Sequence, residues 1–143
     1  MGLTRVAVVG GPVSESPAEF VAAAAELGRV LAEQGIGLAR PEEAADGFIA
    51  LPGGPATLAE LFTTCLVPSG AGGEASDKPC GLLNTDHFFS DLLKTSEDAL
   101  VERFARESQR GRLVVDRDPA ALLRAMAEYL PPETRRRTPR DGQ

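Results

Sequence analysis

Apolar residues in this chain form short β-branched runs that alternate with longer stretches of helical spacing. The run at 6–9 ends in Gly10 and Gly11, as a buried parallel strand does where it enters a turn. The next stretch has the apolar spacing of a helix that buries one face, with Phe20, Ala24, Leu27 and Leu31 in the stripe. We therefore predict a strand, a glycine turn and a helix, in that order.

The start of this helix is marked by Ser16, which precedes Pro17 and stands three residues before Glu19. This spacing predicts a capping box that begins at Ser16, with Pro17 at the first helical position. Gly35 is placed to end the helix.

The same order of elements recurs along the rest of the chain. The further strands are predicted at 48–51, 79–84 and 113–115. The helices after them have start signals near Leu58, at Thr85 or Asp86, and at Asp118. Repeated strand–helix units predict an α/β fold. We expect residues 1–130 to form a single Rossmann-like domain, a three-layer sandwich with a small, mostly parallel sheet of about three to five strands.

Charge is unevenly distributed along the chain. The formal net charge is −6, while residues 131–143 hold four arginines against Glu133 and Asp141, a net +2, so the rest carries −8. An acidic body repels nucleic acid at long range, and we expect no nucleic-acid partner. The segment 131–143 is rich in Arg and Pro and lacks apolar periodicity, so we expect a disordered tail.

Membrane and secreted proteins are disfavoured. No stretch approaches the roughly 20 apolar residues of a membrane-spanning helix, so we expect no membrane partner. Residues 1–5 lead directly into the first apolar run, and we expect no secretory signal. Cys65 and Cys80 fit reduced core thiols better than a disulfide scaffold. We therefore expect a cytoplasmic protein.

The turn at 52–57 has the composition of an anion site. Gly53 and Gly54 allow backbone N–H groups to face outward, and the helix that follows adds its positive dipole end. The Thr57 hydroxyl can bind the same phosphate. Thr57 and Glu60 also have the spacing of a capping box, in which they serve only to begin the helix.

Residues 52–60 read Pro-Gly-Gly-Pro-Ala-Thr-Leu-Ala-Glu. This segment resembles the hallmark Pro-Gly-Gly-x-Gly-Thr-x-x-Glu of the Lonely Guy family, also called lysine decarboxylase-like proteins, with Ala56 in place of the third glycine. Other segments are similar to the family as well, namely 22–35, 45–50, 78–84 and 88–93. The resemblance spans nearly the whole chain, and the family consists of cytokinin riboside 5′-monophosphate phosphoribohydrolases.

The resemblance implies a site for a nucleoside 5′-monophosphate or a similar phosphorylated small molecule. The residues it assigns to the phosphate are Gly53, Gly54, Ala56 and Thr57. It assigns Glu60 to catalysis, because cleavage of an N-glycosidic bond builds positive charge on the sugar. Gly10 and Gly11 occupy a second, weaker place of nucleotide contact. If the family glycine needs a positive φ, the methyl of Ala56 impairs phosphate approach.

The block that carries the family's catalytic arginine is missing here. Family members place a glycine-rich turn, a helix start, a third strand and a His-x-Arg-Lys segment before the hallmark strand. In this chain Arg40 is followed by only the six residues 41–46. Arg40 could supply the lost cation at the sheet edge where α/β ligands gather, or it is a solvated surface arginine.

The gap also affects the expected topology, because a crossover between parallel neighbours needs about a dozen residues. Either residues 35–40 leave the sheet, or they become an edge or exchanged element. If the first helix keeps its family face, the hallmark strand should take the place of the lost second strand and change the strand order. A shortened sheet exposes an edge that a partner usually covers. We expect a homodimer, as the resemblance also implies.

Two functions compete on these grounds. The first is hydrolysis of a nucleoside 5′-monophosphate to free base and ribose 5-phosphate. The second is a catalytically inactive homologue that binds a nucleotide or a partner protein. A site for another phosphate ester is a third, weaker alternative. Lysine decarboxylation is disfavoured, since nothing marks a pyridoxal phosphate pocket.

No metal or other cofactor is expected. His87 is the single histidine, and with two cysteines fifteen residues apart it does not make a zinc site. We interpret His87 as a residue at the start of a helix.

Overall fold

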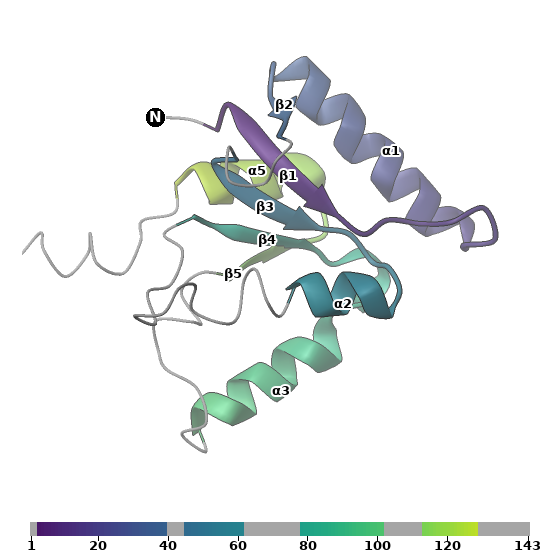
Figure 1. Ribbon diagram of the computed structural model, residues 1–143, viewed down its shortest axis with the longest axis vertical. Coiled ribbons are helices and arrows are strands. Elements are labelled where there is room, and N and C mark those ends of the chain that lie inside the picture. The colour runs from purple at the N-terminus through teal and green to yellow at the C-terminus, as the bar shows by residue number, and fades with distance from the viewer. Residues whose placement is uncertain (1–2, 40–44, 62–77, 102–112, 129–143) are drawn as a thin grey trace, which may run out of the picture.

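Five parallel strands form the sheet of this chain, in a computed structural model that describes residues 3–39, 45–61, 78–101 and 113–128 (Figure 1). The spatial order is β2-β1-β3-β4-β5. The strands are β1 (Arg5–Val9), β2 (Gly37–Leu38), β3 (Gly47–Ala50), β4 (Cys80–Leu83) and β5 (Leu113–Asp116). The predicted α/β class with a small parallel sheet is confirmed.

Helices cover both faces of the sheet, which makes three layers (Figure 1). One face carries α1 (Ala18–Glu33) and α5 (Pro119–Ala127). The other carries α2 (Pro55–Leu61) and α3 (Ser90–Val101). A short 3₁₀ turn, η3 (Thr85–His87), stands between β4 and α3. No helix among the described residues is long and apolar enough to cross a membrane.

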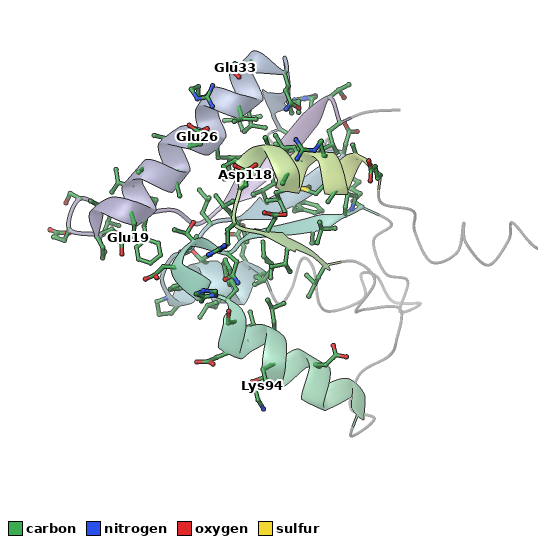
Figure 2. All side chains as sticks on the ribbon, turned by 180° about the vertical axis from the view of Figure 1, so that it is seen from behind. Glu19, Glu26, Glu33, Lys94 and Asp118 are labelled. Atoms are coloured by element: carbon green, nitrogen blue, oxygen red, sulfur yellow. The ribbon has the colours of Figure 1, made fainter. Side chains whose placement is uncertain are left out.

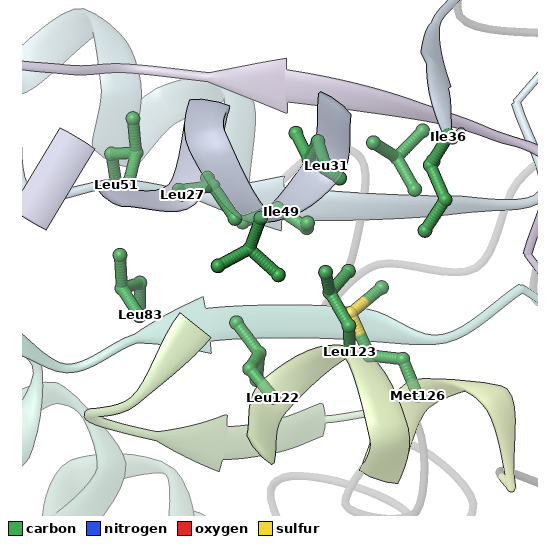
Figure 3. Packing of buried hydrophobic residues seen from close by; sticks show 11 residues of the cluster. Leu27, Leu31, Ile36, Ile49, Leu51, Leu83, Leu122, Leu123 and Met126 are labelled. Atoms are coloured by element: carbon green, nitrogen blue, oxygen red, sulfur yellow. The ribbon is translucent and has the colours of Figure 1, made fainter. Parts of the chain in front are cut away.

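The core is divided by the sheet into two clusters, because successive side chains of a strand point to opposite faces. In β3, Phe48 and Ala50 belong to the cluster under α2 and α3, whereas Ile49 belongs to the cluster under α1 and α5. Figure 3 shows the second cluster, in which Leu27 and Leu31 of α1 lie across Ile49 from Leu122 and Met126 of α5. The helical stripe of α1 therefore buries Leu27 and Leu31, as its spacing predicted.

The position of β3 differs from the expected one. Val6 of β1 pairs with Leu38 on one side and with Gly47 on the other, so β2 is a two-residue edge strand and β3 lies beyond β1. The prediction that the hallmark strand replaces the second strand is wrong, whereas the alternative of an edge element is confirmed. β2 ends at the level of β1 at which β3 begins, so a connection between them does not require a helical crossover.

Asp46, which directly precedes β3, forms hydrogen bonds with residues at the start of β1. Its Oδ2 accepts hydrogen bonds from the Thr4 hydroxyl (2.6 Å), the Thr4 N–H (2.8 Å) and the Arg5 N–H (3.0 Å). These bonds, the Thr4 hydroxyl first, hold the pKa of Asp46 below its ordinary value. The Asp46 carboxylate therefore holds the residue before β3 against the start of β1.

Asp46→Ala is expected to lower the free energy of unfolding by about 1–2 kcal/mol at neutral pH, because three hydrogen bonds are lost. A lowered pKa stabilises the fold above the pKa of the unfolded chain, and that stabilisation is lost as pH falls through the folded value. Urea unfolding from about pH 7 to pH 2.5 should show the deficit shrinking below about pH 4. Exposed Glu15, replaced by Ala, is the control; an equal deficit at every pH would contradict this role.

Two of the predicted helix starts are corrected by the structure. Ser16 does not cap α1: Pro17 is the capping residue, and the Ser16 hydroxyl accepts from the Val13 N–H at 2.9 Å instead. α3 begins at Ser90, after the predicted caps Thr85 and Asp86. The start at Asp118 is confirmed, since its Oδ2 accepts from the Ala121 N–H at 2.9 Å and Pro119 takes the first position.

Cys80 also differs from its prediction. It is fully buried in β4, as expected, but it is disulfide-bonded rather than a thiol. The chain's other cysteine, Cys65, lies outside the described residues, as does the segment 131–143 for which a disordered tail was predicted. The prediction of a reduced thiol is therefore wrong for Cys80, and this residue gives no support to a cytoplasmic location.

Candidate functional site

The carboxyl ends of β1 and β3 lie side by side, at the point where the order in which the chain adds strands to the sheet reverses. From β1 the chain first proceeds to β2 on one side, and β3, β4 and β5 then follow on the other. In open α/β sheets, ligands bind where the loops diverge at such a point. The two loops that begin here contain Gly10 and Gly11 after β1, and Gly53 and Gly54 after β3.

These two loops pack together around Thr57. A β-carbon on Gly10 would lie 2.5 Å from Thr57 Cγ2 and 2.6 Å from the Leu51 carbonyl oxygen. A β-carbon on Gly53 would overlap Thr57 Oγ1 and lie 3.3 Å from the Gly11 N. Thr57 is 8% exposed, and its side chain fills the space between the glycines. Glycine is required at both positions because any side chain would push the loops apart.

The position of Thr57 rules out the capping-box interpretation. α2 begins at Pro55, not near Leu58, and the N–H groups of Thr57 and Leu58 both donate to the Gly54 carbonyl, at 3.0 and 3.2 Å. Thr57 therefore lies inside the helix rather than at its cap. Pro55 explains the earlier start, because its fixed φ suits the first helical position.

The hallmark loop keeps N–H groups available to a ligand. Within the described ranges, the backbone N–H groups of Gly53, Gly54 and Ala56 donate to no other residue. Nothing lies within 4 Å of the place where a β-carbon on Gly54 would stand. Ala56 is helical and exposed, so the methyl that replaces the family glycine brings no backbone strain. The concern that Ala56 needs a positive φ does not apply.

Glu60 lies exposed on α2, three residues after Thr57, and residues at this spacing are neighbours on a helix surface. The helix therefore carries Glu60 close to the loop that Thr57 anchors. Arg40, the predicted source of a cation, lies outside the described residues. The strand before it, β2, ends level with Val6, three residues short of the carboxyl end of β1.

Sequence reasoning missed Asn84, which begins the next loop at this edge of the sheet. Asn84 is 7% exposed, and its Oδ1 accepts from the Phe89 N–H at 2.6 Å. Its backbone N–H donates to the Asp116 carbonyl of β5 at 2.9 Å. The signal was an asparagine directly after a buried strand, a residue that readily bonds nearby backbone groups.

Exposed acidic side chains lie along α1 and at the start of α5. Figure 2 shows Glu19, Glu26 and Glu33 along α1, with Asp118 at the start of α5. Glu26 and Glu33 pair with Arg29 on α1 itself. Among the residues that the structure describes, no group of three or more His, Cys, Asp or Glu side chains could hold a metal ion.

Comparison with known proteins identifies the hallmark. The family described as "possible lysine decarboxylase" matches residues 38–126, which include β3, the hallmark loop and the Asn84 turn. The chain belongs to the Lonely Guy family.

Several named relatives are similar to this Lonely Guy chain. A probable cytokinin riboside 5′-monophosphate phosphoribohydrolase of Oryza sativa subsp. japonica is 42% identical over 86 residues, which cover 60% of this chain and 34% of the relative. A second from the same organism is 35% identical over 142 residues, covering 92% and 56%. The cytokinin riboside 5′-monophosphate phosphoribohydrolase of Rhodococcoides fascians is 39% identical over 84 residues, covering 59% and 41%. The chain thus spans between 34% and 56% of the length of these three relatives.

Proposed function

We propose that this chain hydrolyses the N-glycosidic bond of a nucleoside 5′-monophosphate and releases free base and ribose 5-phosphate. The single observation that carries the proposal is the packing of Thr57 between Gly10 and Gly53. Thr57 is buried against both loops instead of capping α2, which leaves the hallmark N–H groups available. The names of the relatives, cytokinin riboside 5′-monophosphate phosphoribohydrolases, support this substrate class.

The proposed chemistry uses a phosphate cradle and one carboxylate. Gly53, Gly54, Ala56 and Thr57 would bind the 5′-phosphate, with Gly10 and Gly11 as a second contact. The C1′–N bond breaks with its electron pair leaving on the base, and positive charge builds on the ribose ring. Glu60 stabilises that charge and accepts the proton of the attacking water, whose oxygen forms the new bond to C1′. The base takes up a proton from solvent.

Lysine decarboxylation is not supported, in spite of the family description. A pyridoxal phosphate enzyme needs a lysine beside its cofactor, and this chain has only Lys78 and Lys94. Lys78 precedes β4 at the amino end of the sheet, where its Nζ stands 5.9 Å from the centre of the Phe48 ring. Lys94 points away from the sheet on the outer side of α3 (Figure 2). Both lie away from the hallmark loop.

A catalytically inactive homologue that binds a nucleotide or a partner protein is the second candidate. The observation that favours it is the absence of the arginine-bearing block, which leaves only 39–46 between β2 and β3. Arg40 belongs to that connection and is proposed as the replacement cation. A cation from Arg40 would favour the hydrolase over the inactive homologue, and only measured turnover can show that it is used.

The test is incubation of the purified chain with AMP, GMP, CMP, UMP and isopentenyladenosine monophosphate, followed by chromatography for free base and ribose 5-phosphate. Hydrolysis predicts equal amounts of base and ribose 5-phosphate from at least one substrate. Binding of a nucleotide without either product would select the inactive homologue. The absence of both binding and turnover would overturn the proposal.

Gly54→Ala is expected to weaken AMP binding by about tenfold while leaving the free energy of unfolding within about 0.5 kcal/mol. The added methyl meets no protein atom within 4 Å, but it would stand where phosphate approaches the loop. Calorimetric titration with AMP and urea unfolding measure the two effects. Gly28→Ala, whose methyl also meets nothing, is the control. Unchanged AMP affinity would place the phosphate elsewhere.

We also propose a homodimer. The exposed edge of β2, where Leu38 is 60% exposed, supports a partner that covers it. Light scattering of the purified chain tests the oligomeric state.

A further inference from the structure

The turn after β4 holds its backbone in an unfavourable conformation. Asp86 (φ 52°) and His87 (φ 59°) occupy the left-handed region, and no other non-glycine residue in the described part of the chain does so. Two consecutive side chains in this region cost free energy that glycine would not. Such costs persist where the surrounding structure imposes them, and they concentrate at functional sites.

Hydrogen bonds to the buried residue Asn84 hold the turn in this conformation. The Asn84 carbonyl oxygen accepts from the His87 N–H at 3.3 Å, and its side-chain Oδ1 accepts from the Phe89 N–H at 2.6 Å. The turn is therefore fixed on both sides of Asp86 and His87. Thr85 adds a second cost, because its Oγ1 is the one buried side-chain polar atom among the described residues that has no hydrogen-bond partner. A turn selected for stability alone would not combine these features.

The sheet places this turn beside the hallmark loop. Ala50 of β3 pairs with Leu82 of β4, so the hallmark loop and the turn follow neighbouring strands at the same edge of the sheet. On its other side, the Phe88 ring packs edge-on against Phe20 in the first turn of α1, with centroids 6.1 Å apart. The turn thus stands between the hallmark loop and the helix that follows the Gly10 loop.

We propose that His87 forms one wall of the nucleotide site and hydrogen-bonds the nucleoside part of the bound monophosphate. This inference rests on the proposed function. The phosphate would occupy the hallmark loop, so the neighbouring turn meets the ribose or the base. His87 is favoured over Asp86 because an imidazole both donates and accepts, whereas a carboxylate repels an anionic ligand.

Glycine substitutions test the proposal, because each relieves the same backbone strain. His87→Gly and Asp86→Gly should each raise Tm by about 4 °C. His87→Gly should also weaken AMP binding by about tenfold and leave binding of inorganic phosphate unchanged, whereas Asp86→Gly should keep AMP affinity within about twofold. Ribose 5-phosphate is the third probe: a parallel loss assigns the contact to the ribose, and a loss for AMP alone assigns it to the base.

The inference fails if the His87→Gly variant binds AMP as tightly as the wild type does. It also fails if Asp86→Gly weakens AMP binding as much as His87→Gly. If His87→Gly does not fold, His87→Ala removes the imidazole and carries the same expectation: reduced AMP affinity with phosphate binding retained. A wild-type chain that binds no AMP overturns the proposed function itself, a result distinct from equal binding by wild type and variant.

Discussion

Gly10→Ala is expected to lower the free energy of unfolding by about 3 kcal/mol. About 1 kcal/mol comes from placing a side chain at φ +81°, and about 2 kcal/mol from overlap with its neighbours. The neighbours are the Leu51 carbonyl oxygen and the Thr57 methyl group, at 2.6 and 2.5 Å from the added β-carbon. The carbonyl belongs to the backbone and cannot rotate away, so the two loops must separate. Urea unfolding at pH 7 measures the change.

Two other glycines separate the causes of this effect. Gly35 has φ +70° but no atom within 4 Å of an added β-carbon, so Gly35→Ala should cost only about 1 kcal/mol. Gly28 lies inside α1 with open space around it, and Gly28→Ala should stabilise the helix by up to about 1 kcal/mol. Equal losses for Gly10→Ala and Gly35→Ala would show that the loops do not pack around Thr57 as described.

The kind and order of the elements could be predicted from the sequence because buried parallel strands read as continuous apolar runs. Phe48 to Ala50 is such a run, and all four residues of β3 are buried. Asp118 followed by Pro119 marks a helix start by contacts that lie within a few residues of each other. The structure confirms both of these predictions, whereas the local signals at Ser16 and at Thr85 or Asp86 did not mark the helix starts correctly.

The start of α2 could not be predicted correctly, because two local signals conflict there. Thr57 and Glu60 have capping-box spacing, but Pro55 suits the first helical position and begins the helix earlier. The side chain of Thr57 then packs against Gly10, which is 47 residues away in the sequence. No local pattern contains that contact. The loop therefore lies where it was predicted, and only the capping alternative for its threonine is wrong.

The predicted strand order was wrong for a related reason. Counting the residues after Arg40 assumed that the second strand runs the full length of the sheet, whereas β2 has two residues and pairs only with the start of β1. Register between strands is a long-range property, and the hydrogen bonds from Thr4 and Arg5 to Asp46 that fix it here are not visible in the local pattern. The strained Asp86–His87 turn escaped notice for the same reason, since Asn84 imposes it from a buried position.

Glu60→Gln is expected to lower the rate of base release from a nucleoside monophosphate by at least about 100-fold, while AMP affinity changes by less than about threefold. The amide keeps the size of the carboxylate but can neither accept the proton of water nor balance positive charge on the ribose ring. Glu60 is exposed on α2, so the substitution leaves the core intact. Release of base and ribose 5-phosphate at saturating substrate measures the rate, and calorimetry measures the affinity.

Glu19→Gln is the matched control, because it removes the same charge from an exposed position in the first turn of α1 (Figure 2). Its rate should stay within about twofold of the wild type, since surface charges are screened over about 10 Å in salt. Base release that persists in Glu60→Gln at the wild-type rate would assign the reaction to another group. A selective loss would mean that the family chemistry operates without its arginine block, and the Gly54→Ala and His87→Gly variants would then separate phosphate binding from recognition of the nucleoside.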